Sequence, residues 1–333
     1  MMNETIRDVL AKPEYKFLET DDRLGSHLIL LTFGGSKLYG TDTSASDTDI
    51  RGVTLEKASD VIGFSNFEQR IDNATDTVIY GFNKFIKLCL DNNPNVLELL
   101  APRENDYIAS GIGHKLLDMQ HDFLSKRCAR SFGGYAHQQL RRLENALCHD
   151  RYNEADRQRH LFNTLHDNIQ HLQERYSVTD YGIFDIVNDD EIRVHMCVDG
   201  MPLNDIRSLF SEMNEIVKTY NKLNGRNHKK DNLHLNKHAM HLIRLFLMAI
   251  DIFEKEKIIA YRKDDIPLLM SIRNGEFQKE DSTYKPEFFE MVDEYEKRFD
   301  YACANTSLPD VPNIKKVEEF VMNVNRCVVE WRM

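Results

Sequence analysis

Apolar and polar positions in the first part of the chain alternate in short runs, which predicts a small sheet with helices around it. The apolar run 27–33 is ended by two glycines and indicates a buried strand that leads into a tight turn. The β-branched and aromatic run 75–80 predicts a second strand, and residues 82–90 follow it with helical spacing. A short strand is expected at 107–109. This order favours a mixed α/β sheet up to about residue 124.

The chain after residue 124 has mostly helical spacing, with one interruption. Helices are predicted at 131–147, 203–223, 235–253, 264–272, 287–299 and 317–331. Two β-branched runs within 183–198, separated by Asn188-Asp189-Asp190, are typical of a β-hairpin. We therefore predict an α+β protein. A small mixed-sheet domain would occupy residues 1–124, and a mainly α-helical domain with a β-hairpin insertion would occupy residues 125–333.

Composition favours a globular protein of the cytoplasm. The chain has 333 residues, of which 41% are hydrophobic and 29% charged. We expect no membrane partner, since no apolar run is long enough to span a bilayer and the amino-terminus lacks the pattern of a signal peptide. The six cysteines form no C-x-x-C pair, so a cysteine zinc site or redox motif is not expected.

The net charge of −11 limits how the chain can bind nucleic acid. Proteins that hold long nucleic acids over their whole surface are usually basic, so any basic groove must be local. A small nucleotide that arrives with Mg²⁺ is compatible with an acidic protein, because the metal supplies positive charge.

Two motifs near the first strand carry the candidate chemistry. Gly34-Gly35-Ser36-Lys37 directly follows that strand, and paired glycines let backbone N–H groups approach a phosphate closely. Asp47-Thr48-Asp49 comes next, and in a strand residues i and i+2 point to the same face. Two such carboxylates repel unless a hard cation such as Mg²⁺ or Mn²⁺ lies between them. A glycine turn followed by a solvated acidic loop is the alternative, but the order and spacing favour phosphoryl or nucleotidyl transfer.

These residues resemble the nucleotidyltransferases of the DNA polymerase β superfamily. Its pattern is a helical turn opened by Gly-Ser, matched by Gly35-Ser36, and then an Asp-x-Asp strand, matched by Asp47-Thr48-Asp49. The fuller run from Gly35 to Gly52 is similar to predicted nucleotidyltransferases of bacteria and large phages, including polymerase β-like proteins associated with RNA repair. The similarity continues in blocks at 93–100, 132–136 and 237–245.

The resemblance also implies a third carboxylate on a neighbouring strand. We expect Asp76, at the start of the second strand, with Asp72 and Glu98 as alternatives. Asp47, Asp49 and Asp76 would then be the catalytic residues and would hold two Mg²⁺ or Mn²⁺ ions.

A nucleoside triphosphate needs positive charge opposite these carboxylates. Lys237, His241 and Arg244 share one helical stripe and are the candidates in the helical domain. The alternatives are a metal site at His234, His238 and His241, or histidines that only flank the core. The predicted nucleotide-binding residues are Gly34, Gly35, Ser36, Lys37, Arg51, Lys237, His241 and Arg244. Ser36 also fits a helix cap, Lys37 a solvated turn, and Arg51 a structural ion pair.

The expected function is Mg²⁺-dependent transfer of a nucleoside monophosphate from a triphosphate to an acceptor hydroxyl, with release of pyrophosphate. The helical domain would close the nucleotide cleft. The acceptor is an RNA end, a protein side chain or a small molecule, and the resemblance favours RNA. Two alternatives stay open: a nucleotide-binding regulatory module of toxin–antitoxin or defence type, and a kinase that moves the γ-phosphate. A phage-encoded member would act in the host cytoplasm.

Overall fold

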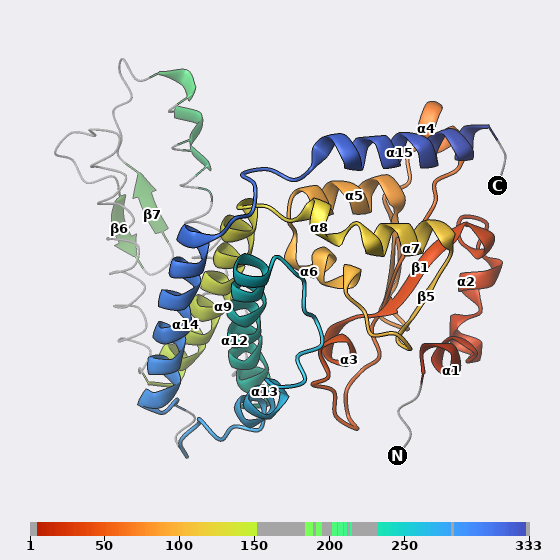
Figure 1. Cartoon of the computed structure of the whole chain (residues 1–333). Helices are drawn as coiled ribbons and strands as arrows, with labels where there is room; N and C mark the ends of the chain where they lie inside the picture. Colours follow the sequence, from red (N-terminus) through yellow and green to blue (C-terminus); the bar gives the residue numbers. More distant parts are fainter. Residues whose placement is uncertain are drawn as a thin grey trace. The chain divides into compact units, whose positions relative to one another are not determined.

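The structure is a computed structural model that describes residues 5–151, 184–188, 191–194, a few positions between 202 and 214, 232–280 and 283–330. Its contacts divide the chain into two compact units, one formed by Met1–Arg142 with Asn236–Met333 and the other by Leu143–Leu235. Figure 1 shows the elements along the chain. The boundary predicted after residue 124 stays a prediction, because the helices on both its sides belong to the first unit.

A five-stranded mixed sheet lies at the centre of the amino-terminal part, in the order β3-β4-β2-β1-β5. The strands are β1 (Leu28–Phe33), β2 (Ile50–Thr54), β3 (Gln69–Asp72), β4 (Thr77–Gly81) and β5 (Tyr107–Ala109). β2 and β4 run parallel, and the other neighbours pair antiparallel. The predicted sheet is confirmed.

Short helices cover this sheet where their apolar positions meet it. Ile6 and Val9 of α1 and Leu18 of α2 are buried against Phe33 and other residues of the sheet. The helices are α1 (Ile6–Leu10), α2 (Phe17–Thr20), α3 (Gly35–Tyr39), α4 (Ala58–Ile62), α5 (Phe82–Leu90), α6 (Pro94–Leu97), α7 (Gly111–Asp118) and α8 (Gln120–Phe123). Single 3₁₀ turns occur at Pro13–Tyr15, Gly25–His27 and Glu98–Leu100.

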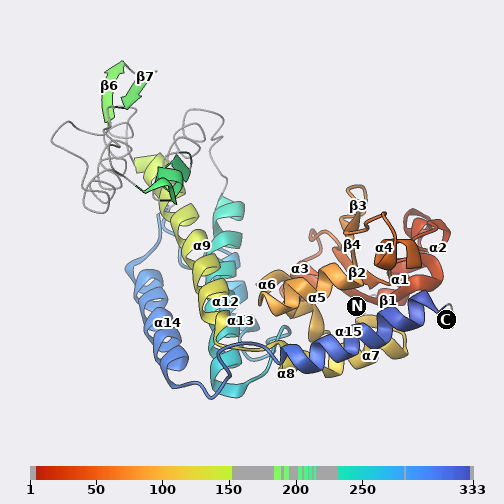
Figure 2. The same ribbon diagram turned by 90° about the horizontal axis from the view of Figure 1, so that it is seen from above.

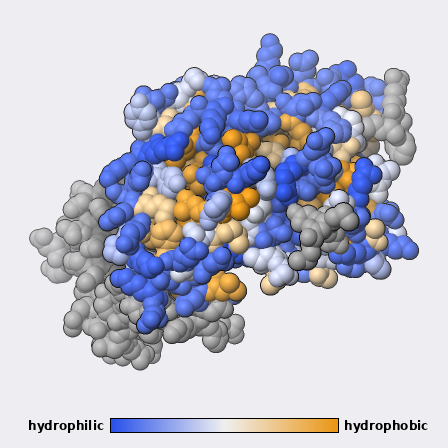
Figure 3. All heavy atoms as spheres, turned by 60° about the horizontal axis from the view of Figure 1, so that its bottom comes forward, coloured by the Kyte–Doolittle hydropathy of each residue, from blue (hydrophilic) through white to orange (hydrophobic). Residues whose placement is uncertain are grey.

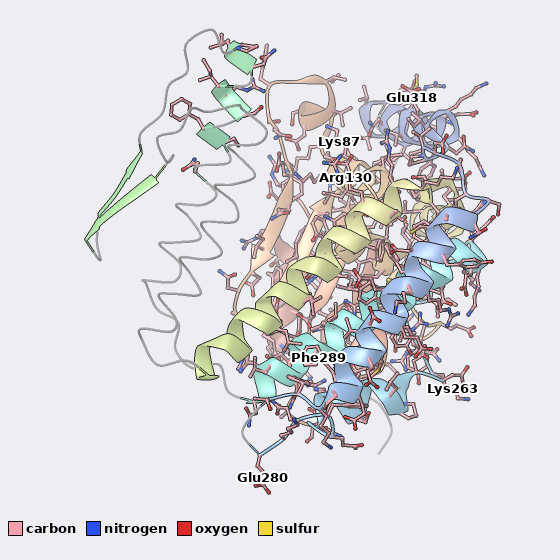
Figure 4. The ribbon with its side chains drawn as sticks, turned by 90° about the vertical axis from the view of Figure 1, so that its left-hand side faces the viewer. Lys87, Arg130, Lys263, Glu280, Phe289 and Glu318 are labelled. Atoms are coloured by element: carbon pink, nitrogen blue, oxygen red, sulfur yellow. The ribbon has the colours of Figure 1, made fainter. Side chains whose placement is uncertain are left out.

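Longer helices follow, as the helical spacing predicts. They are α9 (Arg127–Arg151), α12 (Asn232–Lys255), α13 (Ile266–Arg273), α14 (Pro286–Asn305) and α15 (Ile314–Val329). Figures 1 and 4 show α9, α12 and α14 side by side. Phe299 of α14 joins them, since its ring contacts Phe246 and Phe253 of α12 at centroid distances of 5.9 Å and faces Gly133 of α9.

The last helix returns to the amino-terminal part. Figures 1 and 2 show α15 beside α5 and α8. Phe320 packs edge-on against Phe82 of α5 at 5.7 Å, and Lys316 forms an ion pair of 2.8 Å with Asp122 of α8. α15 thereby covers apolar side chains of the elements that surround the sheet.

The predicted hairpin is present as β6 (Phe184–Asn188) and β7 (Glu191–Val194), which pair antiparallel. The helix predicted at 203–223 lies largely outside the described residues. No helix within the described ranges has the length and apolar character needed to cross a membrane. Hydrophilic side chains cover most of the face in Figure 3, with apolar ones near its middle, as expected from 29% charged residues.

Candidate active site

The register of two parallel strands brings Asp49 and Asp76 together. Ile50, the first residue of β2, pairs with Thr77, the first residue of β4. Asp49 and Asp76 each precede these residues by one position, so both lie at the same edge of the sheet. The Ile50 N–H donates to the carbonyl oxygen of Asp76 at 3.3 Å, which fixes the two segments to each other.

The turn before β4 determines how Asp76 is presented. Asp76 has a left-handed backbone with φ of +45°, a conformation that aspartate tolerates better than most residues. Asp72 binds within this turn, because its Oδ2 accepts from the Thr75 N–H at 3.1 Å and from the Thr75 hydroxyl at 2.8 Å. Of the three candidates for the third carboxylate, the structure therefore brings Asp76 next to Asp49.

Arg51 bridges the two carboxylates. Its Nη2 donates to Asp49 Oδ1 and to Asp76 Oδ1, each at 3.1 Å. Its Nη1 donates to the backbone carbonyls of Ile50, at 3.0 Å, and of Asp76. The ion-pair role that the sequence allows for Arg51 is thus present.

The proximity of Asp49 and Asp76 shifts their pKa values in opposite directions. Burial, a hydrogen bond with Asp76 and the Asp76 charge raise the pKa of Asp49 to about 6, although Arg51 and Lys237 oppose the rise. The same hydrogen bond, followed by Arg51, lowers the pKa of Asp76. Asp49 thus holds a proton toward Asp76 under mildly acidic conditions. Lys237 of α12 is near enough to act on both groups.

The glycine turn makes room for Asp49. Gly35 has φ of +53°, and a Cβ atom there would lie 2.0 Å from Asp49 Oδ2. A Cβ atom on Gly34 would lie 2.8 Å from Arg51 Cγ. The Gly34 N–H also donates to the Asp49 carbonyl oxygen at 2.9 Å. Both glycines are therefore needed for the close approach of the β2 side chains to the turn.

Ser36 and Lys37 lie in the first turn of α3, a helix of five residues. Both are half-buried. The Lys37 ammonium lies 4.9 Å from the centroid of the Phe33 ring, so its charge is directed to an aromatic face in this structure.

Asp47 is exposed and lies in the loop before β2. The strand begins only at Ile50, so the expectation that strand alternation places Asp47 and Asp49 on one face does not hold. Within this loop, Thr43 and Ser46 hydrogen-bond to each other. Within the described ranges, no group of three or more His, Cys, Asp or Glu side chains is placed to hold a metal ion.

Arg244 occupies a buried position that differs from the predicted one. Its Nη1 pairs with Glu98 Oε2 at 3.0 Å, and the Tyr39 hydroxyl donates to Glu98 Oε1 at 2.6 Å. The guanidinium also stacks 3.7 Å above the Tyr39 ring. Arg244 and Glu98 are only 3% and 4% exposed. Contact with triphosphate would require this pair to open, and Glu98 is no longer available as a third carboxylate.

His241 is half-buried, with its ring edge-on to Tyr39 at a centroid distance of 6.2 Å. Burial and then the charges of Arg244 and Lys237 hold its pKa well below the usual value, so it is neutral. His238 Nδ1 lies 3.0 Å from Gln139 Oε1. Of the predicted stripe on α12, Lys237 is the exposed member.

Sequence reasoning missed Arg273, the last residue of α13. Its Nη2 donates to Ser46 Oγ at 3.2 Å, and its Nη1 donates to the Thr41 carbonyl. A lone arginine more than two hundred residues from the loop carries no motif that could have identified it.

The comparisons with known proteins agree with this geometry. Residues 3–165 match the model of the RNA repair pathway DNA polymerase beta family, and this range contains the sheet, the glycine turn and all three predicted carboxylates. No curated protein and no solved structure matches the chain. Over this region, which is just under half of the chain, the sequence is similar to the polymerase β-like nucleotidyltransferases of the RNA repair pathway family.

Proposed function

We propose that the chain is a Mg²⁺-dependent nucleotidyltransferase that moves a nucleoside monophosphate from a triphosphate to an acceptor hydroxyl. The observation that carries the proposal is the Asp49–Asp76 pair beside the Gly34-Gly35 turn, within the region that matches the family. A generic acidic surface would not bury a carboxyl whose pKa is raised to about 6 by burial and by its neighbour.

Asp49 and Asp76 fit a hard divalent cation. Their oxygens are the ligands that Mg²⁺ and Mn²⁺ prefer, and the shared proton marks a repulsion that a cation would relieve. Asp47 would join them from its loop. Two bound ions would supply positive charge to the phosphates and acidify the acceptor hydroxyl.

The chain's own residues would orient the reaction. Asp76 is the more exposed carboxylate, with its side chain 57% accessible, and its lowered pKa keeps it ionised to accept a hydrogen bond from the acceptor. The acceptor oxygen would form a bond to the α-phosphorus while its proton passes to Asp76, and the bond from that phosphorus to the bridging oxygen would break so that pyrophosphate leaves. Lys237, Arg51 and the Gly34-Gly35-Ser36 turn would contact the phosphates.

We further propose an RNA end as the acceptor. The family's description as part of an RNA repair pathway supports this choice. The net charge of −11 is compatible with it only if the chain binds a short end and not an extended strand.

Transfer of label from triphosphates tests the proposal. The chain is incubated with Mg²⁺ and each nucleoside triphosphate, labelled at the α- or the γ-phosphate, in the presence of RNA, DNA or protein acceptors. We expect α-label in RNA and none from the γ-position. γ-Label in an acceptor would instead indicate a kinase, and nucleotide binding without transfer to any acceptor would favour a regulatory module.

The carboxylates are tested by a paired set of variants. Asp47→Asn with Asp49→Asn should abolish transfer. The matched control is Asp293→Asn, which removes an exposed carboxylate that pairs with Lys297 on α14 and should leave transfer unchanged. Equal transfer by the parent and the double variant would overturn the metal-pair argument.

A further inference from the structure

The loop that carries Asp47 is held from outside by α13. Arg273 donates to the Thr41 carbonyl at the start of this loop and to Ser46 Oγ, at 3.2 Å, one residue before Asp47. The loop also closes on itself, because the Thr43 N–H donates to Ser46 Oγ at 2.9 Å and the Ser46 N–H to the Thr43 carbonyl at 3.0 Å. One guanidinium therefore spans both ends of a closed turn.

A second contact fixes the start of the loop, next to Thr41. Gly40 has φ of +76° and ends α3, and a Cβ atom there would lie 2.3 Å from the Tyr261 ring. Tyr261, like Arg273, lies outside the residues that match the family. The Arg103 guanidinium lies over the Tyr261 ring, 4.2 Å from its centroid. The segment between α12 and α13 thus packs against the start of the loop, and Arg273 binds both its start, at Thr41, and its far end, at Ser46.

We propose that Arg273 is a positioning residue that holds residues 41–46 so that Asp47 is presented to the ions bound by Asp49 and Asp76. This inference rests on the proposed function. On this proposal an exposed aspartate outside any strand would complete the metal site of Asp49 and Asp76. It also makes the metal site depend on a helix that lies far along the chain from the sheet.

The chemistry of the side chain matters here. Arginine presents two parallel donors in a rigid plane, which suits two acceptors at opposite ends of one turn. Lysine carries a single ammonium on a flexible stem. Arg273→Lys should therefore still hold residues 41–46 in part, and Arg273→Gln should hardly hold them at all.

Hydrogen exchange on the full-length, metal-free protein tests the positioning directly. In Arg273→Gln, we expect the amides of Thr41, Thr43 and Ser46 to exchange at least about tenfold faster than in the parent, because a hydrogen bond to a charged group is lost. In Arg273→Lys, these amides should exchange at rates between those of the parent and of Arg273→Gln. Amides of α5 should be unchanged, which separates this effect from general unfolding. Unchanged exchange in the loop would overturn the inference.

Binding of Mn²⁺, followed by electron paramagnetic resonance, tests the link to the metal site. We expect Arg273→Gln to bind Mn²⁺ roughly 10- to 100-fold more weakly than the parent, as found when groups that orient metal ligands are removed. Arg298→Gln is the matched control, because it removes an exposed arginine that pairs with Glu254, and it should bind Mn²⁺ like the parent.

The failures of the two proposals differ. A parent that binds Mn²⁺ no better than Asp47→Asn with Asp49→Asn would overturn the proposed function, and with it the role of Arg273. A parent whose binding depends on those aspartates, together with an Arg273→Gln variant that binds equally well, would overturn the inference alone.

Discussion

Position 35 has no room for a side chain, because Asp49 occupies the space beside Gly35. In Gly35→Ala, the new Cβ would meet Asp49 Oδ2 at 2.0 Å, and the residue would keep an unfavourable positive φ. We expect a loss of about 1–3 kcal/mol in the free energy of unfolding, measured in urea. We also expect loss of label transfer, because Asp49 must move away from the turn.

Gly134→Ala provides the comparison for this substitution. Gly134 lies inside α9, and a Cβ atom there would contact nothing within 4 Å. Alanine should stabilise the helix by up to about 1 kcal/mol and leave transfer unchanged. Equal effects of the two substitutions would show that a Cβ atom at Gly35 disturbs neither the backbone nor Asp49.

Asp49 gives the site a predictable dependence on pH. Its pKa is about 6 in the folded chain against an ordinary value of 3.8, so the folded chain holds a proton between these values that the unfolded chain has released. The free energy of unfolding therefore falls as pH rises from about 4 to about 6. The lowered pKa of Asp76 acts in the opposite direction, but mainly below pH 4 and so outside this range. We expect a decrease of about 1–3 kcal/mol between pH 4 and pH 6.

Denaturation of the parent and of Asp49→Asn at pH 4.5 and pH 7.5 measures this effect. The variant lacks the titrating group, so its stability relative to the parent should be higher at pH 7.5 than at pH 4.5. A difference of the opposite sign would mean that Asp49 is ionised at lower pH than its burial and neighbours imply.

At the scale of elements, the buried pair of Glu98 and Arg244 connects α12 to the 3₁₀ turn after α6. Arg244→Met would leave Glu98 buried without its countercharge. We expect a cost of roughly 3–5 kcal/mol in the free energy of unfolding, with partial recovery when Glu98→Gln is added. Urea denaturation of the two single variants and the double variant gives the coupling.

This set of variants also separates two roles of Arg244. Arg298→Met removes an exposed partner of Glu254 and should cost no more than about 1 kcal/mol. An Arg244→Met chain that unfolds like the parent but binds triphosphate more weakly would support the predicted phosphate contact and contradict the structural role.

The sequence predicts elements well where periodicity and burial agree. Phe82–Leu90 matches its predicted bounds because Phe82, Phe85, Ile86 and Cys89 form one buried stripe at helical spacing. β3 was missed because its residues 69–71 are exposed and polar positions dominate it, so pairing with β4 and not burial makes it a strand. Burial on one face is the signal that pattern reasoning uses, and β3 lacks it.

The candidate site likewise contains some contacts that local sequence patterns predict and others that they do not. The approach of Asp76 to Asp49 follows from local rules, since both residues precede the first residues of parallel neighbours. The burial of Arg244 does not follow, because its spacing with Lys237 and His241 is the same for a phosphate-binding stripe and for a core-facing one. Only the position of Glu98 and Tyr39 decides between them. Arg273 is a contact across long sequence separation and leaves no local pattern.

At the scale of the whole chain, the amino-terminal part depends on elements from the carboxy-terminal end. α15 places Phe320 against Phe82 and pairs Lys316 with Asp122, while α12 supplies Arg244 to Glu98. Residues 1–124 alone would therefore expose apolar surface of α5 and α8 and would leave a buried carboxylate without its partner.

We expect a fragment of residues 1–124 not to fold into the native sheet, although this range is the predicted catalytic domain. Circular dichroism and amide exchange of the fragment and the full chain measure this, and the fragment should lack protected amides in β1 and β2. Introducing Glu98→Gln and Phe82→Leu into the fragment reduces the unpaired charge and the exposed aromatic surface, and should restore protection in part. A fragment that folds unaided, with the protection of the full chain, would show that residues 1–124 are an independent domain and that α12 and α15 act on the site without being needed for its fold.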